Sequence, residues 1–99
     1  MEKEIEKEKE YDCGILKFEG EYLNGKRNAK GKECDHGKLI FEGEYLNGKR
    51  NGKGKEYGVF GELKFEGEYL NGNKWNGNGY NYSGKLIFEG EYKNGKYYK

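Results

Sequence analysis

The chain is short and strongly polar: of its 99 residues, 37% are charged and only 32% are hydrophobic. Its 19 basic and 18 acidic residues nearly balance, which argues against a nucleic-acid binder with a basic patch. No run approaches the roughly 20 apolar residues of a transmembrane segment. The charged N-terminus lacks the apolar part of a signal peptide, so we expect an intracellular, cytoplasmic protein.

Residues 1–9 are a charged lead-in in which acidic and basic residues alternate. In a helix, Lys3 and Lys7 would be like-charged neighbours one turn apart, which is unfavourable. We therefore expect this segment to be frayed or extended. Its last part, Lys7 to Tyr11, is expected to pair as a strand with Ile15 to Tyr22.

The rest of the chain repeats itself. The stretch FEGEYLNGKRNGKG at 41–54 recurs as FEGEYLNGKRNAKG at 18–31, as FEGEYLNGNKWNGNG at 65–79, and as FEGEYKNGK from Phe88. The leading phenylalanines are 23 or 24 residues apart (41 − 18, 65 − 41 and 88 − 65), a period typical of repeat proteins. We divide residues 10–99 into a half repeat at 10–17, repeats at 18–40, 41–64 and 65–87, and a partial repeat at 88–99.

Each repeat predicts a β-hairpin. Asn-Gly between runs of alternating polarity is the strongest short signal for a type I′ turn. If Asn47-Gly48 is the loop, the expected cross-strand partners are Tyr45–Arg50, Gly43–Gly52 and Phe41–Gly54. These residues would share one aromatic and glycine face, and pairs of opposite charge such as Glu42–Lys53 would occupy the other. Aromatic rings are expected to fill the space over the glycines.

Longer or shorter loops would keep this pairing elsewhere. In the third copy, a three-residue loop at 71–73 places Tyr69 opposite Trp75, and Phe65 and Gly67 opposite Gly79 and Gly77. Between repeats, the expected loops are Asp35-His36-Gly37, Gly58–Gly61 and Ser83-Gly84. They place Gly31, Gly54 and Gly79 opposite Phe41, Phe65 and Phe88.

The predicted fold is all-β: an elongated, single-layer antiparallel meander that is open at both edges. Strands are expected near 15–23, 26–34, 38–46, 49–57, 62–70, 74–82 and 85–93, with a short last strand at 96–99. The repeat positions expected to hold this sheet together are Phe18, Gly20, Gly31, Phe41, Gly43, Gly52, Gly54, Phe65, Gly67, Gly77, Gly79, Phe88 and Gly90.

The pattern F-x-G-x-Y-x-x-G-x-x-x-G-x-G at 41–54 resembles a MORN repeat. The copy at 18–31 fits the same pattern, except that Ala29 stands where the pattern has glycine. The segments 37–41 and 54–57 also resemble the variant MORN repeats of bacteria, which include a family proposed as antitoxins. The resemblance implies side-by-side hairpins in a twisted sheet that serves protein–protein contact, homodimerisation or binding of anionic lipid, and it implies no catalytic residue.

The residues that could carry chemistry are few. His36 is the only histidine and is expected in an exposed loop. Cys13 and Cys34 do not form a Cys-x-x-Cys pattern, and the predicted register puts them two strands apart, too far for a disulfide. We therefore expect no enzyme, no metal site, no cofactor and two free thiols.

The aromatic stripe leaves two interpretations open. Its rings are either the core alone, or also the floor of a partner-binding groove. The groove residues would be Tyr22, Tyr45, Tyr69, Trp75 and Tyr92, with Arg27 and Arg50, and with Lys74 continuing the row of cations. We expect a scaffold for protein–protein interaction, acting through this groove or by self-association. The alternatives are an adaptor for anionic phospholipid head groups, peripheral at membranes, and an antitoxin-like module.

Overall fold

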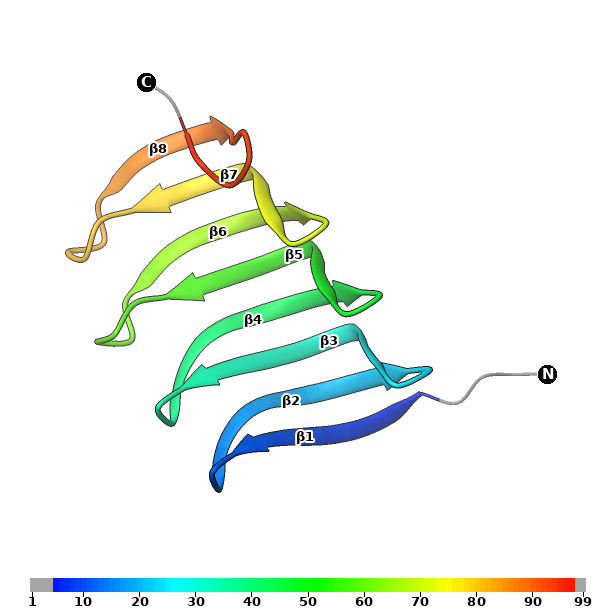
Figure 1. Ribbon diagram of the computed structural model, residues 1–99. Helices are drawn as coiled ribbons and strands as arrows, with labels where there is room; N and C mark the ends of the chain where they lie inside the picture. The colour runs from blue at the N-terminus through cyan, green and yellow to red at the C-terminus, as the bar shows by residue number, and fades with distance from the viewer. Residues whose placement is uncertain (1–4, 98–99) are drawn as a thin grey trace.

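The computed structural model describes residues 5–97, and these form one antiparallel sheet of eight strands in chain order. Each strand pairs with its neighbours in sequence, and no helix occurs in the described part of the chain (Figure 1). The strands are β1 (Glu6–Asp12), β2 (Ile15–Leu23), β3 (Lys26–Asp35), β4 (Lys38–Leu46), β5 (Lys49–Tyr57), β6 (Leu63–Leu70), β7 (Asn73–Tyr80) and β8 (Leu86–Glu91). The predicted all-β meander with open edges is therefore confirmed, and each expected strand end from β1 to β8 lies within about two residues of the observed one.

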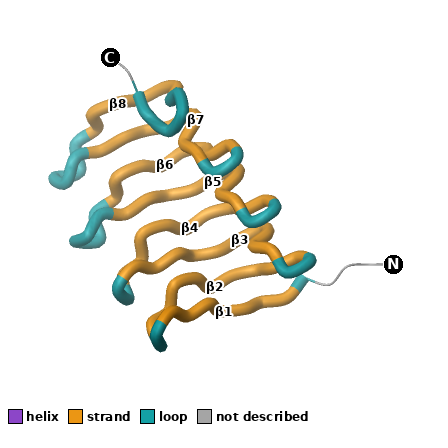
Figure 2. The backbone as a smooth tube through the Cα atoms, viewed as in Figure 1, coloured by secondary structure: helices purple, strands orange, loops and turns teal. Residues whose placement is uncertain are grey.

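The turns lie in two rows at opposite ends of the strands (Figure 2). In the Asn-Gly turns both central residues have positive φ, for example 50° at Asn47 and 84° at Gly48, as a type I′ turn requires. His36-Gly37 has the same geometry, and Asp35 pairs with Lys38. The prediction of a three-residue loop there is wrong, because this connection is also a two-residue turn.

The predicted register within a hairpin is correct at the turn and wrong beyond it. Tyr45 pairs with Arg50, but Gly43 pairs with Gly54 rather than Gly52, and Phe41 pairs with Glu56 rather than Gly54. The cause is a bulge in which residues 51–53 of β5 lie opposite one residue of β4. A left-handed φ of 100° at Gly52 permits it.

The side chain of Glu44, on β4, completes this bulge. The backbone N–H of Lys53 donates to Oε1 of Glu44 at 2.7 Å, and Lys30 donates in the same way to Glu21 at 3.0 Å. Each of these bonds satisfies one backbone donor of its bulge. In the earlier repeat the bulge places Ala29 at φ 65°, in the region that usually favours glycine.

Pairing between repeats is shifted as well. Gly31 pairs with Gly43, and Phe41 pairs with Glu33, so the predicted Gly31–Phe41 pair is wrong. Gly54 likewise pairs with Gly67 rather than Phe65, whereas the predicted Gly79–Phe88 pair is correct. Small register shifts near the ends of these strands cause the difference.

The extra residue of the third copy also forms a bulge instead of lengthening the turn. Phe65–Gly79 and Gly67–Gly77 pair as predicted, but Tyr69 pairs with Lys74. The predicted Tyr69–Trp75 pair is wrong, because Trp75 is the residue that lies in the bulge. The Asn71-Gly72 turn keeps two residues, since Leu70 pairs with Asn73.

The outcome of these shifts is a row of glycines, one on each strand from β2 to β8, each paired with the next: Gly20, Gly31, Gly43, Gly54, Gly67, Gly77 and Gly90. Adjacent strands approach closely along this row. A Cβ atom added at Gly43 would lie 2.5 Å from the carbonyl oxygen of Lys53 and 2.6 Å from Cα of Gly54. Gly20, Gly67 and Gly77 lie equally close to backbone atoms of the strand they pair with, so a side chain at any of these four positions would push the paired strands apart.

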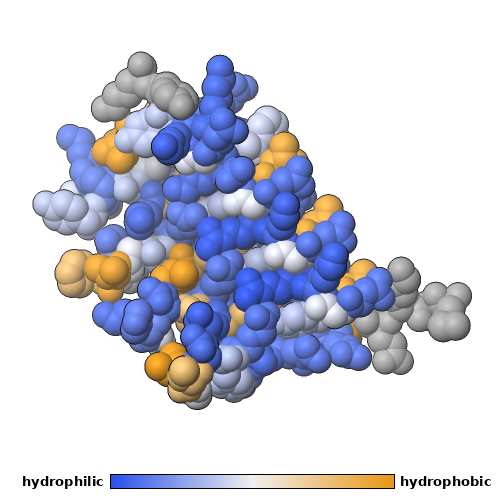
Figure 3. Space-filling view, in the orientation of Figure 1, coloured by the Kyte–Doolittle hydropathy of each residue, from blue (hydrophilic) through white to orange (hydrophobic). Residues whose placement is uncertain are grey.

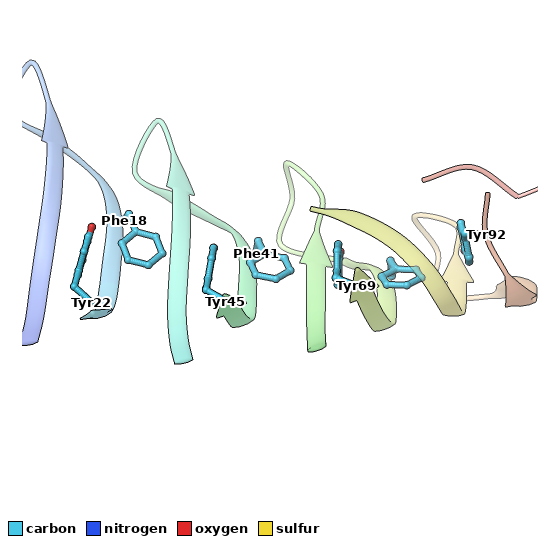
Figure 4. Packing of buried hydrophobic residues seen from close by; sticks show 7 residues of the cluster. Phe18, Tyr22, Phe41, Tyr45, Tyr69 and Tyr92 are labelled. Atoms are coloured by element: carbon cyan, nitrogen blue, oxygen red, sulfur yellow. The ribbon is translucent and has the colours of Figure 1, made fainter. Parts of the chain in front are cut away.

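Aromatic rings form the core on one face of the sheet. Phe18, Phe41 and Phe65 are fully buried, and each contacts the tyrosine of its own repeat and that of the next. The rings meet edge to face, with centroids 5.1–5.7 Å apart (Figure 4), the geometry that aromatic pairs favour. The ring of Phe41 also lies against Gly43 and Gly54, so the expected filling of glycine spaces by rings is correct there, but at Gly52 the neighbouring side chain is Glu44 and not a ring.

At the last aromatic ring, a tyrosine takes the position that arginine holds in earlier repeats. Tyr97 follows the Asn94-Gly95 turn at the position that Arg27 holds after Asn24-Gly25, and it stacks on Phe88 at 4.5 Å with an interplanar angle of 18°. Of the predicted last strand, only the Lys93–Lys96 bridge is present among described residues, because positions 98–99 lie outside them. Residues 1–4 of the lead-in also lie outside the described chain, and the strand expected from Lys7 is β1.

Candidate functional site

The tyrosines of the predicted groove lie inside the aromatic core. Tyr22, Tyr45, Tyr69 and Tyr92 are only 2–7% exposed. Trp75 is 43% exposed and makes no ring contact with the row in the described part of the chain. Little of the tyrosine surface can therefore be reached by a partner, and the structure does not bring Trp75 together with the tyrosines.

The predicted row of cations is present, but each cation is held by the core. The guanidinium of Arg27 lies 4.0 Å from the ring centroid of Phe18, and that of Arg50 lies 4.1 Å from Phe41. Lys74 Nζ lies 5.0 Å from the Phe65 ring. These distances are those of cation–π contacts, so the cations cover the rings that the open sheet would leave to water.

Carboxylates on the same face fix these cations in place. Arg50 donates through Nε and Nη2 to the two carboxylate oxygens of Glu33, at 2.8 and 3.1 Å, and through Nη1 to Glu56 at 2.9 Å. The hydroxyl of Tyr45 also donates to Glu33. Such two-pronged, charge-assisted bonds restrict both partners strongly. The set formed by Arg50, Glu33 and the Tyr45 hydroxyl is one arginine, one glutamate and one tyrosine, which we call a trio.

The same trio recurs one repeat earlier. Arg27 donates through Nε and Nη2 to Glu10 at 2.8 and 3.1 Å, and the Tyr22 hydroxyl donates to the same carboxylate. These glutamates were not among the residues predicted from the sequence. For Glu33 the signal is the recurrence of Gly-Lys-Glu at 31–33 and 54–56, which places a glutamate on the same face as the glycine two residues before it. Glu10 follows Glu8 and Lys9 and lacks this glycine.

The pKa values follow from these contacts. Burial raises the pKa of the Glu33 carboxyl, but hydrogen bonds from Arg50 and Tyr45 outweigh it and hold the pKa below its usual range. The hydrogen bond from Arg27 is the main cause of the lowered pKa of Glu10. Burial raises the pKa of Tyr22 to about 12. At neutral pH the arginine and the glutamate of each trio are therefore ionised, and the tyrosine hydroxyl keeps its proton and donates it to the carboxylate, which suits a structural role.

The third trio is incomplete. Lys74 binds Glu56 at 3.1 Å, and Arg50 holds the other oxygen of the same carboxylate. The hydroxyl of Tyr69 is buried and makes no hydrogen bond of regular geometry among the described residues, although the Glu56 carboxylate lies near it. Burial raises the pKa of this hydroxyl.

The opposite face of the sheet carries charges in stripes, one stripe on each strand. We call it the striped face, and it consists of Lys7 and Lys9 on β1, Glu19 and Glu21 on β2, Lys30 and Lys32 on β3, Glu42 and Glu44 on β4, Lys53 and Lys55 on β5, Glu66 and Glu68 on β6, Asn76 and Asn78 on β7, and Glu89 and Glu91 on β8. The two members of each stripe flank the glycine row, or Glu8 on β1.

Neighbouring stripes form the pairs of opposite charge that the sequence predicted for this face. Lys9 lies 3.5 Å from Glu19, and Lys55 lies 3.4 Å from Glu66. The partner of Glu42 within its hairpin is Lys55 rather than the predicted Lys53, because of the bulge in β5. The face seen in Figure 3 is mostly hydrophilic, and apolar residues gather toward the ends of the strands.

An open groove of about 1350 Å³ crosses the striped face from β1 to β6. Its lining includes glycines 20, 31, 43, 54 and 67, and most of its remaining lining residues are the lysines and glutamates of the stripes. A polypeptide could approach the backbone closely along the glycines and meet charges of both signs beside it. From the sequence we expected pairs of opposite charge on this face, but no groove.

The remaining candidate residues show no catalytic arrangement within residues 5–97. His36 is exposed and lies 3.0 Å from Asp35, and both Cys13 and Cys34 are free thiols. Residues 5–97 contain no group of three or more side chains that could hold a metal ion. In the same range no helix is long and apolar enough to cross a membrane.

Comparison with known proteins identifies the repeat. The family described as MORN repeat matches residues 18–35, 41–59 and 88–97, and the copy with the extra residue lies between the second and third of these stretches. No curated protein and no solved structure matches the chain. MORN repeats are commonly modules that bind proteins or lipids. The three matched stretches and the hairpin sheet show that this chain contains MORN repeats.

Proposed function

We propose that the chain is a non-enzymatic scaffold that binds protein through its striped face. The observation that supports this best is the groove, in which stripes of lysine and glutamate alternate beside the glycine row. The stripes follow one another at the separation of adjacent strands, about 4.7–4.9 Å. A polypeptide can present both signs of charge to such a surface, whereas a nucleic acid or an anionic membrane presents only one.

The aromatic face supports this choice indirectly. Its tyrosines are buried, and Arg27, Arg50 and Lys74 are bound to glutamates and stacked on rings. These contacts argue against the predicted aromatic groove, and against a free row of cations for lipid head groups, as the binding surface. Lysine and glutamate stems on the striped face add apolar contact area beside their charges.

The test is to select linear peptides from a random display library on the immobilised chain, and then to measure their affinities for two variants. Lys53→Glu/Lys55→Glu reverses one stripe of the groove. Lys26→Glu/Lys49→Glu makes the same change in net charge at exposed hairpin ends outside the groove lining. Circular dichroism and melting curves verify that both variants fold.

We expect the selected peptides to bind the stripe variant roughly tenfold more weakly or worse, and the control variant as tightly as the wild type. Equal affinity for both variants would contradict the proposal. So would a chain that selects no peptide but co-sediments with vesicles containing anionic phospholipid, and not with neutral vesicles, at physiological salt. The latter outcome would favour the lipid alternative.

A further inference from the structure

We propose that the striped face binds the striped face of a second copy of the chain, with the two sheets antiparallel about a two-fold axis between β4 and β5. This inference rests on the proposed function and names the partner of the same surface. Its basis is the order of charges across the sheet, which complements itself in one orientation only.

From β1 to β6 the stripes alternate as lysine, glutamate, lysine, glutamate, lysine, glutamate, and β7 and β8 follow with asparagine and glutamate. The two-fold axis reverses this order in the second copy, so that β1 faces β8, β3 faces β6 and β4 faces β5. Each of these contacts sets a lysine stripe against a glutamate stripe. β2 faces the neutral stripe of β7, so no like charges meet.

The other simple face-to-face arrangement fails this criterion. If the second copy lay parallel to the first, β1 would face β1 and β2 would face β2. Lysine would then oppose lysine and glutamate would oppose glutamate over the whole face, which costs free energy. Charge complementarity therefore selects the antiparallel arrangement, an isologous contact in which both copies use the same surface.

Spacing favours a second copy over other partners. A helix rises by about 1.5 Å per residue and an extended chain by about 3.3 Å, so neither keeps its charges in step with stripes about 4.8 Å apart over many strands. A second sheet has this spacing by construction. Packed sheets cross at roughly 30°, so the match is closest near the axis, on β4 and β5 and their neighbours.

The size of the face is sufficient for such a contact. The Cα atoms extend over 47 × 31 × 16 Å, so the broad face exceeds the roughly 800 Å² that each partner buries in a standard interface. Pairs of exposed charges bind weakly and are screened by salt, since the Debye length falls from about 10 Å at 0.1 M to about 3 Å at 1 M. The dimer is therefore reversible and sensitive to salt.

A charge swap on two facing strands tests the arrangement. Lys30→Glu/Lys32→Glu makes β3 negative, and Glu66→Lys/Glu68→Lys makes β6 positive. In each variant alone, β3 of one copy faces a like-charged β6 of the other. In a mixed dimer, the negative β3 of the first variant faces the positive β6 of the second. The native, negative β6 of the first variant faces the native, positive β3 of the second, so opposite charges meet at both contacts. Molar mass is measured by size exclusion with light scattering.

We expect the wild type to have twice its monomer mass of 11.5 kDa at about 0.05 M salt, and to return to the monomer mass near 1 M salt. Each variant alone should be a monomer, and an equimolar mixture should restore the doubled mass. The mixture supplies its own folding control, because a misfolded variant cannot be rescued by its counterpart. The salt series keeps the test decisive even if one variant fails to fold.

A wild-type chain that stays at the monomer mass at low salt up to millimolar concentration would overturn the inference. So would variants that dimerise alone, or folded variants that do not associate when mixed. These results are distinguishable from failure of the proposed function, which is read from peptide binding. A monomeric wild type whose peptide affinity still depends on Lys53 and Lys55 would refute the second copy as partner and leave the striped face as the binding surface.

Discussion

The substitution Gly43→Ala tests whether close approach of the strands at the glycine row holds the sheet together. The added methyl group would lie 2.5–2.6 Å from backbone atoms of β5, well inside the 3.0 Å that Cβ contacts respect. These atoms belong to a paired strand and cannot rotate away, so the two strands must separate by about half an ångström where Gly43 pairs with Gly54.

Overpacking of this kind costs about 1–3 kcal/mol, and a weakened backbone hydrogen bond adds about 1 kcal/mol. The smaller chain entropy of alanine offsets about 0.5–1 kcal/mol. We therefore expect a net loss of about 1–3.5 kcal/mol in the free energy of unfolding. For a domain of this length, that loss lowers the melting temperature by roughly 5–25 °C.

The matched control is Gly79→Ala, on the same aromatic face. There the added Cβ would meet only the hydroxyl of Tyr92 within 3.0 Å, at 2.8 Å, and the next atoms lie at 3.9 Å or more. A side-chain tip can move aside, so the expected loss is below about 1 kcal/mol. Urea unfolding followed by far-ultraviolet circular dichroism measures both variants. Equal losses at the two positions would refute the reasoning about the glycine row.

Ala29→Gly should stabilise the chain by roughly 1 kcal/mol, because alanine is strained at φ 65°. Gly52→Ala should destabilise the chain by at least as much, because it creates the same strain. Melting temperatures of the two variants that shift in the same direction would contradict this. Glu33 binds a proton more weakly in the folded chain, so its contribution to stability is complete above the usual pKa of 4.5 and is lost as the pH falls through the lowered pKa. The free energy of unfolding, measured from pH 7 to pH 2, should therefore depend less on acid in Glu33→Gln than in the wild type. Equal acid dependence in the two would count against this role of Glu33. Tyr69→Phe should be neutral or slightly stabilising because its hydroxyl makes no hydrogen bond of regular geometry, and Tyr45→Phe should cost roughly 1.5 kcal/mol because it removes a bond to a carboxylate; chemical unfolding that ranks the two in the reverse order would disprove this.

Local sequence signals predicted the strands well for a physical reason. An Asn-Gly pair fixes the turn because few other dipeptides tolerate positive φ at both positions. Alternation then fixes which residues share a face, so Phe41 and Tyr45 were correctly placed on one side of the sheet with glycines beneath the rings. None of this required knowledge of the exact cross-strand partners.

Register was less predictable, because it depends on bulges that pattern alone does not reveal. Gly52 gives a hint of its bulge, but the earlier repeat forms the same bulge with Ala29, a residue that no propensity argument would place in the left-handed region. The side-chain bonds of Glu21 and Glu44 to the bulged backbone contribute to this outcome. The cross-strand partner of Trp75 was predicted wrongly for the same reason, because the extra residue of the third copy lies in the strand and not in the turn.

The candidate site shows the limit of composition as a guide. Exposed-looking tyrosines on a single-layer sheet suggested a groove, yet Arg50 and Glu33 cover them. This cover depends on the two-residue shift that sets Glu33 beside Phe41. The groove on the striped face depends on the same shift, because it aligns the glycines into one row.

Hydroxyl-radical footprinting with mass spectrometry, on the free chain and on the chain saturated with a peptide from the display selection, tests most directly whether the striped face is the binding surface. If the striped face is the binding surface, Tyr45 and Tyr69 stay almost unmodified in both samples. At a concentration low enough to keep the free chain monomeric, Glu44 and the lysines beside it are modified in the free chain and protected by the peptide. Strong modification of the two tyrosines in the free chain, with protection on binding, would contradict this prediction and would return the binding site to the aromatic face.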